Sequence, residues 1–537
     1  MTLLIGFLDV LCRGLAQMSL AASAGGLVFA LVVLRPLGPG DPLSAALLRR
    51  SVRLIALAAV TLAAARLAVL VVLHPVALAD ASGSWPIREF LLTDYGKAGV
   101  ASAVLALVLA AVASWLARHP GSRAGWTLAA AMAGGLVLGT GWLAHAVSRL
   151  EGRESLMALT VLHQLGAVLW VGGLTHLLLA APVLWREAGR AARAGQLLAR
   201  FAPLAMTGVA LVIGPGVVLS WQYVGDWAGL VGTGYGVMVL TKVVLLVLAL
   251  GLGYLNFRLA RRLARAGGAA DAQRVRTFIE AEVGLGLTVL LAAASLTSLP
   301  PAVDVVEDRA TPGEVALRFL PQVPRLTSPA AAALLARAGA IDDALATRQP
   351  EEYAGSEFNH HVSGALLLAM GVLALLERSG RAPWARHWPL IFLGLAAFMF
   401  VRNDPRAWPL GPAGFWESML LPDVLQHRLA VLMVVGLGLF EWLVRIGRLA
   451  RRWRLVFPMI CAAGGAVLLT HSHAMFNLKL EFLSEVAHAP IGVLGMVLGW
   501  ARWLELRLPE RDRGAPAWVG PLCLTLVGAL LLVYREA

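Results

Sequence analysis

The sequence predicts an all-α polytopic membrane protein with about 14 transmembrane helices and little structure outside the bilayer. Hydrophobic residues make up 59% of the 537 residues and charged residues only 14%, a balance unlike that of soluble globular domains. Apolar runs recur along the chain, each long enough to cross a hydrocarbon core of about 30 Å. Because these runs are continuous and do not alternate with polar residues, they predict helices and not the strands of a barrel.

Each apolar run is assigned to one span. The first run lacks a basic leading region and is too long for the apolar part of a signal peptide, so we expect it to be retained as the first helix. The expected spans are 3–34, 51–73, 97–117, 126–147, 157–184, 201–224, 237–258, 278–299, 361–377, 387–402, 424–445, 455–472, 483–504 and 516–534.

Basic residues follow the odd-numbered spans. Examples are Arg49 and Arg50 after the first span and Arg261 and Arg262 after the seventh, whereas the loops after even-numbered spans are acidic or nearly neutral. Cytoplasmic loops carry the excess of Lys and Arg in membrane proteins. This pattern predicts a bacterial inner-membrane protein with both termini on the periplasmic side.

One long extramembrane segment divides the chain. Residues 300–357 are rich in Pro, Ala and acidic residues, contain one helix-like stretch near 329–345, and include no His, Cys or Met. We therefore expect an eight-helix module at 1–299, a periplasmic linker at 300–357 and a six-helix module at 358–537. The linker itself is a poor candidate for binding a soft metal.

The first module contains matching motifs at nearly constant spacing. Gly25-Gly26-Leu27 matches Gly172-Gly173-Leu174, and the Thr-x-Tyr-Gly at 93–96 matches the one at 233–236. Four spans separate the members of each pair, so both copies share one orientation. The first eight helices are therefore expected to form two parallel four-helix repeats.

Charge and cysteine content exclude several functions. The net charge of +13 is explained by arginines in cytoplasmic loops, so no nucleic-acid partner is expected; the lipid bilayer is the partner that the composition implies. Cys12, Cys461 and Cys523 are too scattered for a disulfide framework or a CxxC metal motif. No nucleophile–base arrangement or phosphate-binding loop is present, so we do not expect an enzyme.

Histidines gather at one side of the predicted membrane. The orientation is assigned from Arg and Lys alone, so the distribution of the histidines is independent of that assignment. Imidazole is a good ligand for copper, zinc, nickel or haem iron, so the pattern predicts a metal-binding function at the outer face. The histidines at or near outward helix ends are His74, His145, His163, His360, His361, His427, His471, His473 and His488.

Eight of these histidines are candidate metal ligands. In the first module, His145 and His163 lie on spans joined by a short loop and are expected to meet. In the second, His360 or His361, His427, His471 or His473, and His488 are expected at one level. Met475 adds a thioether suited to Cu(I). The alternative for each is that the histidine belongs to an interfacial belt.

Three polar residues inside spans are candidates for a transport path. Arg66 and Lys242 are cations within the second and seventh spans, where a charge costs at least about 2.5 kcal/mol on insertion scales. His176 lies about 20 Å beyond His163 along the fifth span, too far for one metal site but suited to a second station. Glu280 and Glu282 are expected at the inner interface.

Several motifs resemble the bacterial copper resistance protein D (CopD) family. They are LHQLGAVLWVGGL at 162–174, TGYG at 233–236, LTK at 240–242, Asn256-x-Arg258, Glu280-x-Glu282 and LPP at 299–301, and the resemblance covers about 130–301. It implies copper movement or handling at the inner membrane beside a periplasmic copper-binding protein. It also implies His163 and His145 as ligands and family roles for Lys242 and Asn256.

We therefore predict an inner-membrane copper transporter or copper-handling protein whose outer-leaflet histidines capture copper ions. One alternative is an electron-transfer protein that holds haem b between histidines on adjacent helices. Another is a non-transporting factor that delivers copper to an oxidase. LQH at 425–427 and His471-x-His473 are similar to membrane assembly factors for copper-containing oxidases.

Overall fold

The computed structural model describes residues 2–37, 42–83, 85–184, 191–266, 269–338, 350–402, 404–405, 407–470 and 479–536. Most of these residues are helical, and no strand occurs among them, which confirms the all-α class. Within these residues, thirteen helices are long and apolar enough to cross a membrane. The remaining expected span, 455–472, is represented by a helix of 13 residues, Val456–Leu468.

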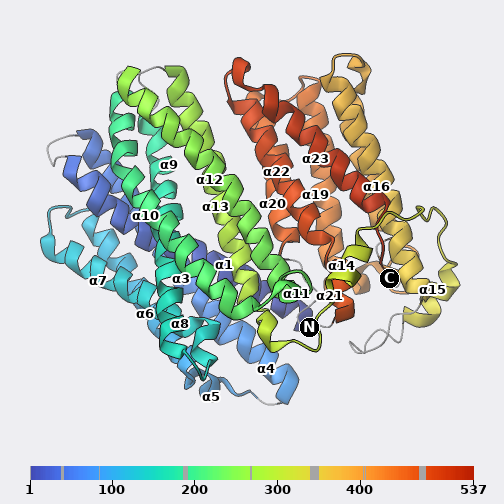
Figure 1. Cartoon of the computed structure of the whole chain (residues 1–537), viewed down its shortest axis with the longest axis horizontal. Helices are drawn as coiled ribbons and strands as arrows, with labels where there is room; N and C mark the ends of the chain where they lie inside the picture. The colour runs from blue at the N-terminus through green and yellow to red at the C-terminus, as the bar shows by residue number, and fades with distance from the viewer. Residues whose placement is uncertain are drawn as a thin grey trace. The chain divides into compact units, whose positions relative to one another are not determined.

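The chain divides into two compact units (Figure 1). The first contains residues 2–230 and 238–306. Its helices are α1 (Thr2–Leu20), η1 (Ala21–Gly25), α2 (Gly26–Phe29), η2 (Ala30–Leu34), η3 (Arg35–Leu37), α3 (Pro42–Leu67), η4 (Ala68–Leu73), α4 (His74–Ser82), α5 (Ile87–Leu91), α6 (Asp94–Leu116), α7 (Arg123–Gly139), η5 (Thr140–Leu143), η6 (His145–Ser148), α8 (Arg153–Ala167), η7 (Val168–Gly172), α9 (Gly173–Leu184), α10 (Ala191–Val224), α11 (Trp227–Val231), α12 (Gly234–Ala266), α13 (Ala269–Leu296) and η9 (Ala302–Asp304).

The second unit contains residues 231–237 and 307–537. Its core is built by α16 packed along α23 and by α20 packed along α22. Its helices are α14 (Pro312–Arg318), α15 (Ala331–Ala338), α16 (Pro350–Arg378), η10 (Pro383–Leu390), α17 (Ile391–Arg402), α18 (Phe415–Ser418), α19 (Pro422–Arg445), η11 (Arg451–Leu455), α20 (Val456–Leu468), α21 (Lys479–Glu485), α22 (His488–Arg507), η13 (Glu510–Asp512) and α23 (Gly514–Leu532).

Two π-helical segments cross at the centre of the first unit. A Cβ added at Gly25 in η1 would lie 2.0 Å from the carbonyl oxygen of Val168 in η7. A Cβ added at Gly172 would lie equally close to the carbonyl oxygen of Ala21. Only glycine permits this backbone approach. The matching glycine motifs of the sequence therefore form a close backbone contact between the first four and the second four spans.

The matched motifs also share local structure. Both glycine motifs adjoin a π-helix, η1 in one case and η7 in the other. The Thr93 hydroxyl accepts a hydrogen bond from the Gly96 amide at 3.0 Å, and the Thr233 hydroxyl accepts one from Gly236 at the same distance. Side-chain capping of this kind stabilises a helix start. The two segments thus begin their helices in the same way at the spacing expected for a repeat.

The long segment between the modules contains more helix than the sequence predicts. Within it, α14 is capped by reciprocal hydrogen bonds between Thr311 and Glu314. Helix α15 occupies part of the stretch expected to be helical. Helix α16 begins at Pro350, well before the expected start at 361. This early start places Glu357, His360 and His361 within a helix.

Candidate functional site

Helices α8 and η7 form one wall of a polar region in the first unit. Gly166 in α8 and Gly208 in α10 bring these helices into backbone contact, because a Cβ at Gly166 would lie 2.6 Å from the Gly208 carbonyl oxygen. His163 and Trp170 are seven residues apart, which is about two helical turns, so their side chains lie on the same face of this helix. Their partners come from α10, α12 and α13.

His163 is oriented by a backbone carbonyl. Its Nδ1 lies 2.9 Å from the carbonyl oxygen of Val212, so Nδ1 carries the proton and Nε2 carries the lone pair. Gly216 leaves room for the ring, since a Cβ there would lie 3.0 Å from Cε1. A histidine whose second nitrogen donates to a carbonyl has the arrangement found in most metal-ligating histidines.

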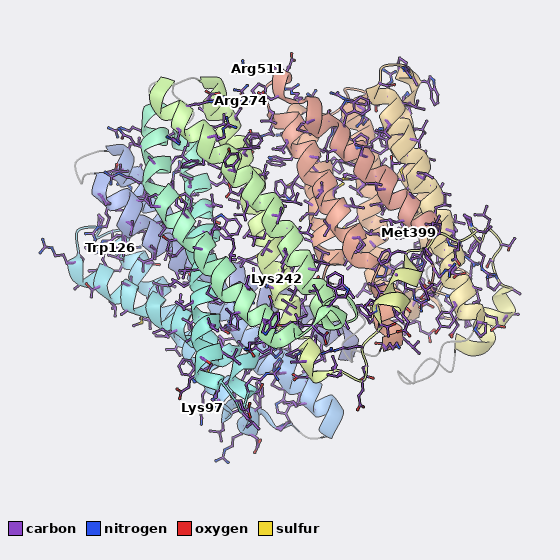
Figure 2. All side chains as sticks on the ribbon, viewed as in Figure 1. Lys97, Trp126, Lys242, Arg274, Met399 and Arg511 are labelled. Atoms are coloured by element: carbon purple, nitrogen blue, oxygen red, sulfur yellow. The ribbon has the colours of Figure 1, made fainter. Side chains whose placement is uncertain are left out.

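Lys242 lies on α12 and interacts electrostatically with His163. Among the described residues it has no ion-pair or hydrogen-bond partner. Figure 2 shows Lys242 and Arg274 far apart along the α12–α13 pair. The ammonium group therefore remains uncompensated in the helix bundle, next to the imidazole that the sequence predicted as a ligand.

Glu282 is buried between three helices, which corrects the expected interfacial position. Its side chain is 5% exposed. Trp170 Nε1 donates to Oε1 at 3.2 Å, and Asn256 Nδ2 donates to Oε2 at 2.8 Å. The sequence interpretation failed because α13 begins at Ala269, nine residues before the expected start at 278, so Glu282 lies in the middle of the helix.

His176 contacts the crossing of the two halves. Its Nε2 lies 2.8 Å from the carbonyl oxygen of Ala22, while Nδ1 is buried without a hydrogen-bond partner among the described residues. Gly26 makes room for it, because a Cβ there would lie 2.0 Å from Nε2. Within the described residues, His176 thus has one nitrogen bonded to a backbone carbonyl and one without a hydrogen-bond partner.

A group of polar side chains joins α1 to the helices around it. Asp9 Oδ2 pairs with Arg13 Nε at 2.6 Å, and His74 Nε2 lies 3.3 Å from Asp9 Oδ1. The His74 ring stacks on Tyr95 with centroids 5.7 Å apart. Arg66 interacts electrostatically with Asp9 and Arg13, although its own Nε is buried without a hydrogen-bond partner in the described part of the chain.

This group was not recognised from the sequence. An acidic residue four positions before an arginine in an otherwise apolar helix was the available signal, because such pairs lie on one helix face.

His145 is oriented by the end of α13: its Nε2 lies 2.9 Å from the carbonyl oxygen of Leu296. Burial lowers the pKa of His145 below its usual value of 6.5. Among the described contacts, none joins the rings of His145 and His163.

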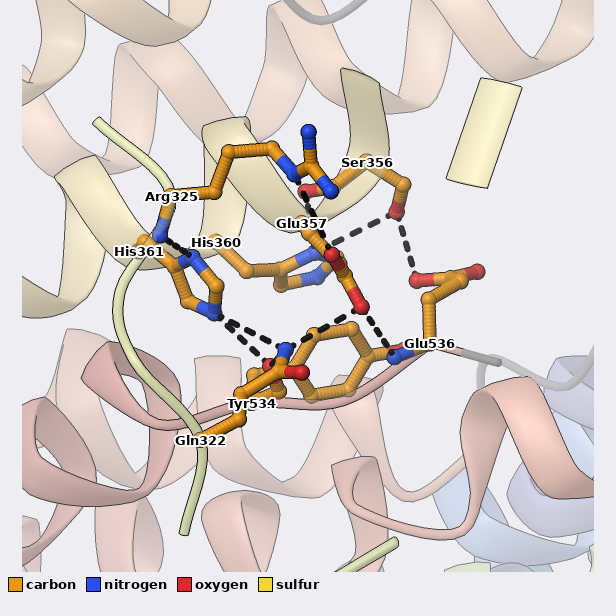
Figure 3. Close-up of polar contacts among 8 residues, drawn as sticks. All are labelled: Gln322, Arg325, Ser356, Glu357, His360, His361, Tyr534 and Glu536. Carbon is orange, nitrogen blue, oxygen red and sulfur yellow. Dashed lines mark hydrogen bonds and ion pairs between the residues drawn. The ribbon is translucent and has the colours of Figure 1, made fainter. Parts of the chain in front are cut away.

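In the second unit, His361 is committed to hydrogen bonds on both sides (Figure 3). The Arg325 backbone amide donates to Nδ1 at 2.6 Å, and Nε2 lies 2.7 Å from the carbonyl oxygen of Tyr534. The adjacent Glu357 accepts hydrogen bonds from Gln322 and from the backbone amide of Glu536. His361 therefore has no nitrogen left for a metal in this arrangement. It connects Arg325, which precedes the module, and Tyr534, near the end of the module, to α16.

His360 has a different environment on the same helix. Its Nδ1 lies 2.9 Å from the Ser356 carbonyl oxygen, which leaves the lone pair on Nε2. Its ring centroid is 4.2 Å from that of Tyr534 and 6.2 Å from that of His488. The structure thus brings two of the predicted ligands, from α16 and α22, close together.

The remaining predicted ligands are not part of a described cluster. His427 lies in the first turns of α19 and is partly exposed. His471, His473 and Met475 lie outside the described residues. Among the residues that are described, no three His, Cys, Asp or Glu side chains are arranged to hold a metal ion.

A network of ion pairs at one end of the second unit was also missed. Glu441 is fully buried; its Oε1 accepts a hydrogen bond from Arg502 Nη2 at 2.8 Å and forms an ion pair with Arg445 Nε at the same distance. Arg445 also pairs with Glu377, and Arg502 pairs with Glu505 at 2.7 Å. Their side chains, except Glu441, line a cavity of about 220 Å³. Arg378 pairs with Glu505 at 3.8 Å as well, so three carboxylates face three guanidinium groups. Because these charges balance, we interpret the network as a structural one.

Comparison with known proteins finds a family match over part of the first unit, which includes Lys242, Asn256 and Glu282. Residues 195–296 match the family described as copper resistance protein D (CopD). Over 250 residues the chain is 31% identical to the copper transport protein CutJ of Bacillus subtilis (strain 168), covering 45% of this chain and 44% of that protein. The match therefore spans less than half of the relative's length. No solved structure matches the chain.

Proposed function

Because the similarities support a protein of the CopD family, we propose that this chain binds copper ions and moves them across a bacterial cytoplasmic membrane. The observation that carries the proposal is the state of His163. It lies on the helix that packs against the matched region, its Nδ1 is 2.9 Å from the Val212 carbonyl oxygen, and the ring interacts electrostatically with Lys242. Neutral imidazole of this kind is a ligand for Cu(I) or Cu(II).

Three more histidines support the same role. His145, His176 and His360 each have one ring nitrogen within 2.9 Å of a backbone carbonyl oxygen, which fixes the tautomer. In this proposal His145 and His163 capture copper from the periplasmic side, and His176 is a later station. Lys242 has no ion-pair partner among the described residues, and Arg66 lies near the Asp9–Arg13 pair. In this proposal both cations would repel a copper ion and so control its passage.

The second unit would hold a separate copper site. His360 and His488 supply two ligands whose ring centroids are 6.2 Å apart. His427, His471, His473 and Met475 are proposed to complete the set. This module, 358–537, would then receive copper from, or deliver it to, the eight-helix module at 1–299, with 300–357 as the connection. A periplasmic copper-binding protein is the proposed donor.

Metal analysis of the purified full chain tests this proposal. We expect copper to co-purify with protein produced in copper-supplemented medium, and we expect no haem absorption band. His163→Gln and His360→Gln should each lower the copper content. His119→Gln is a matched control, because His119 is exposed and stacks on Trp115. A haem band that disappears with these substitutions would instead establish the electron-transfer alternative.

A further inference from the structure

Glu282 is a buried acidic residue of the first unit with no oppositely charged partner among the described residues. Its two hydrogen-bond partners, Trp170 and Asn256, are both neutral donors. The carboxyl group packs against Gly253 of α12, where an added Cβ would lie 3.1 Å from Oε1. Since each partner of Glu282 among the described residues is uncharged, no ion pair compensates a negative charge at this position.

The charged groups on neighbouring elements have other positions or partners. On its own helix, Glu280 pairs with Arg276 at 3.0 Å. On α1, Asp9 pairs with Arg13 beside Thr297 and Ser298, at the end of α13 some four turns away. Helix η7 carries no charged residue. Also on α13, Asp271 pairs with Arg274 at 2.6 Å. The other described charged or titratable groups on these elements form no hydrogen bond or ion pair with Glu282; they are Cys12 on α1, His176 on α9, Arg193, Arg200 and Tyr223 on α10, and Tyr235, Lys242, Tyr254, Arg258, Arg261 and Arg262 on α12.

Lys242 is also too far along α12 to neutralise Glu282. Asn256, which contacts the carboxyl group, lies about 20 Å beyond Lys242 at the rise of an α-helix. An ionised carboxylate inside a helix bundle costs several kcal/mol without a partner. A bound proton removes this cost, and so does a positive charge that enters the same region.

The amide of Asn256 suits a carboxyl group that changes its protonation state. Asn256 is 6% exposed, and its Oδ1 has no hydrogen-bond partner among the described residues. With Nδ2 toward Glu282 the amide donates to a carboxylate. With the amide rotated by half a turn, Oδ1 accepts from the O–H of a carboxylic acid. Either state of Glu282 therefore has a partner, which a lysine or arginine in place of Asn256 would not allow.

We propose that Glu282 couples the movement of a cation through the first unit to the movement of a proton. The carboxylic acid releases one proton when one positive charge enters the helix bundle, and the carboxylate takes up one proton when that charge leaves. The net charge of the bundle is thereby unchanged. This inference rests on the proposed transport function and adds the ion whose gradient drives it.

The test uses the full chain reconstituted in liposomes, with Cu(I) kept reduced outside and a pH-sensitive dye inside. Wild-type protein is expected to show a pH change that accompanies copper entry. Glu282→Gln keeps the hydrogen-bonding capacity but cannot release a proton, so the pH change should be lost while copper still binds to the purified variant. Glu280→Gln, two residues away on the same helix, should retain the pH change.

Two results separate this inference from the proposed function. If the wild type moves copper and Glu282→Gln gives the same pH change, the coupling is overturned while the transport function stands. If the wild type moves no copper, the transport function fails and the coupling fails with it. Infrared difference spectra provide a second measurement: a protonated-carboxyl band that responds to pH in the wild type should be missing in Glu282→Gln, and its persistence would contradict the assignment.

Discussion

The imidazole rings of His360 and His488 lie with their centroids 6.2 Å apart, one on α16 and the other at the start of α22. The two helices are separated in sequence by three long helices of the same unit. Ligands act as a set, because losing one leaves an open coordination position and weakens the others. Two histidines from different helices would therefore bind copper only in the folded module.

The first prediction concerns this pair. His360→Gln and His488→Gln should each weaken copper binding by about 10–100-fold in affinity, the loss typical when a group that supports a metal site is removed. The copper content of the purified protein should fall accordingly. His387→Gln should not, since His387 is exposed and accepts from Trp442 Nε1 at 3.0 Å. Copper titration with each variant measures the effect. Wild-type affinity in both variants would show that the pair is not a metal site.

A second prediction concerns the crossing of η1 and η7. Gly25→Val places a side chain within 2.0 Å of the Val168 carbonyl oxygen, so the helices must separate. Overpacking of this kind costs about 1–3 kcal/mol or more. Thermal unfolding in detergent should show a lower Tm. Gly134→Val is the control, because a Cβ at Gly134 meets nothing within 4 Å. Equal Tm values for the two variants would argue against the tight crossing.

The third prediction is a pH dependence of the contact between α14 and α21. A hydrogen bond from Lys479 and the cap at Thr311 lower the pKa of Glu314 to about 2. The Lys479 Nζ lies 2.7 Å from Glu314 Oε1. Because the pKa is lowered on folding, the contact stabilises the fold above about pH 4.5 and is lost as the pH falls towards 2.

Hydrogen exchange of α14 at a series of pH values measures this contact. Protection in the wild type should persist at pH 4 and decrease towards pH 2. Lys479→Ala should shift the loss of protection to higher pH, since Glu314 then titrates closer to its ordinary value. Identical profiles for both proteins would mean that the ion pair does not hold α14 in place.

The fourth prediction is the orientation in the membrane. Both termini and the segment 300–357 are proposed to be periplasmic, because arginines concentrate in the loops after odd-numbered spans. A reporter active only in the periplasm should function when fused after Glu357 and fail when fused after Arg265. The reverse pattern would place the histidines of the proposed capture sites on the cytoplasmic side.

Much of the fold was predictable because apolar length determines membrane spans. Thirteen of the fourteen expected spans correspond to helices that meet the length and composition of a span. The π-helices were not predictable, because a run such as VLWVG in η7 is equally compatible with an α-helix. The duplicated Gly-Gly-Leu motif, from which the sequence predicted only a repeat, lies where η1 and η7 cross in the structure.

Side-chain partners between distant helices were much harder to predict. His145 and His163 share a short loop in sequence, but the structure attaches one to Leu296 and the other to Val212. Glu282 looked interfacial because the expected helix began too late. His361 resembled a ligand, whereas its hydrogen bonds to Arg325 and Tyr534 depend on chain segments far away in sequence. Such contacts follow from packing, which periodicity alone does not specify.

The central claim is that His163 binds the copper ion that the first unit moves. The most direct test is uptake of Cu(I) into liposomes that contain the full chain, compared among wild type, His163→Gln and His119→Gln. We predict uptake by the wild type and by His119→Gln, and loss of uptake by His163→Gln with an unchanged Tm. Uptake by His163→Gln at the wild-type rate would contradict the claim.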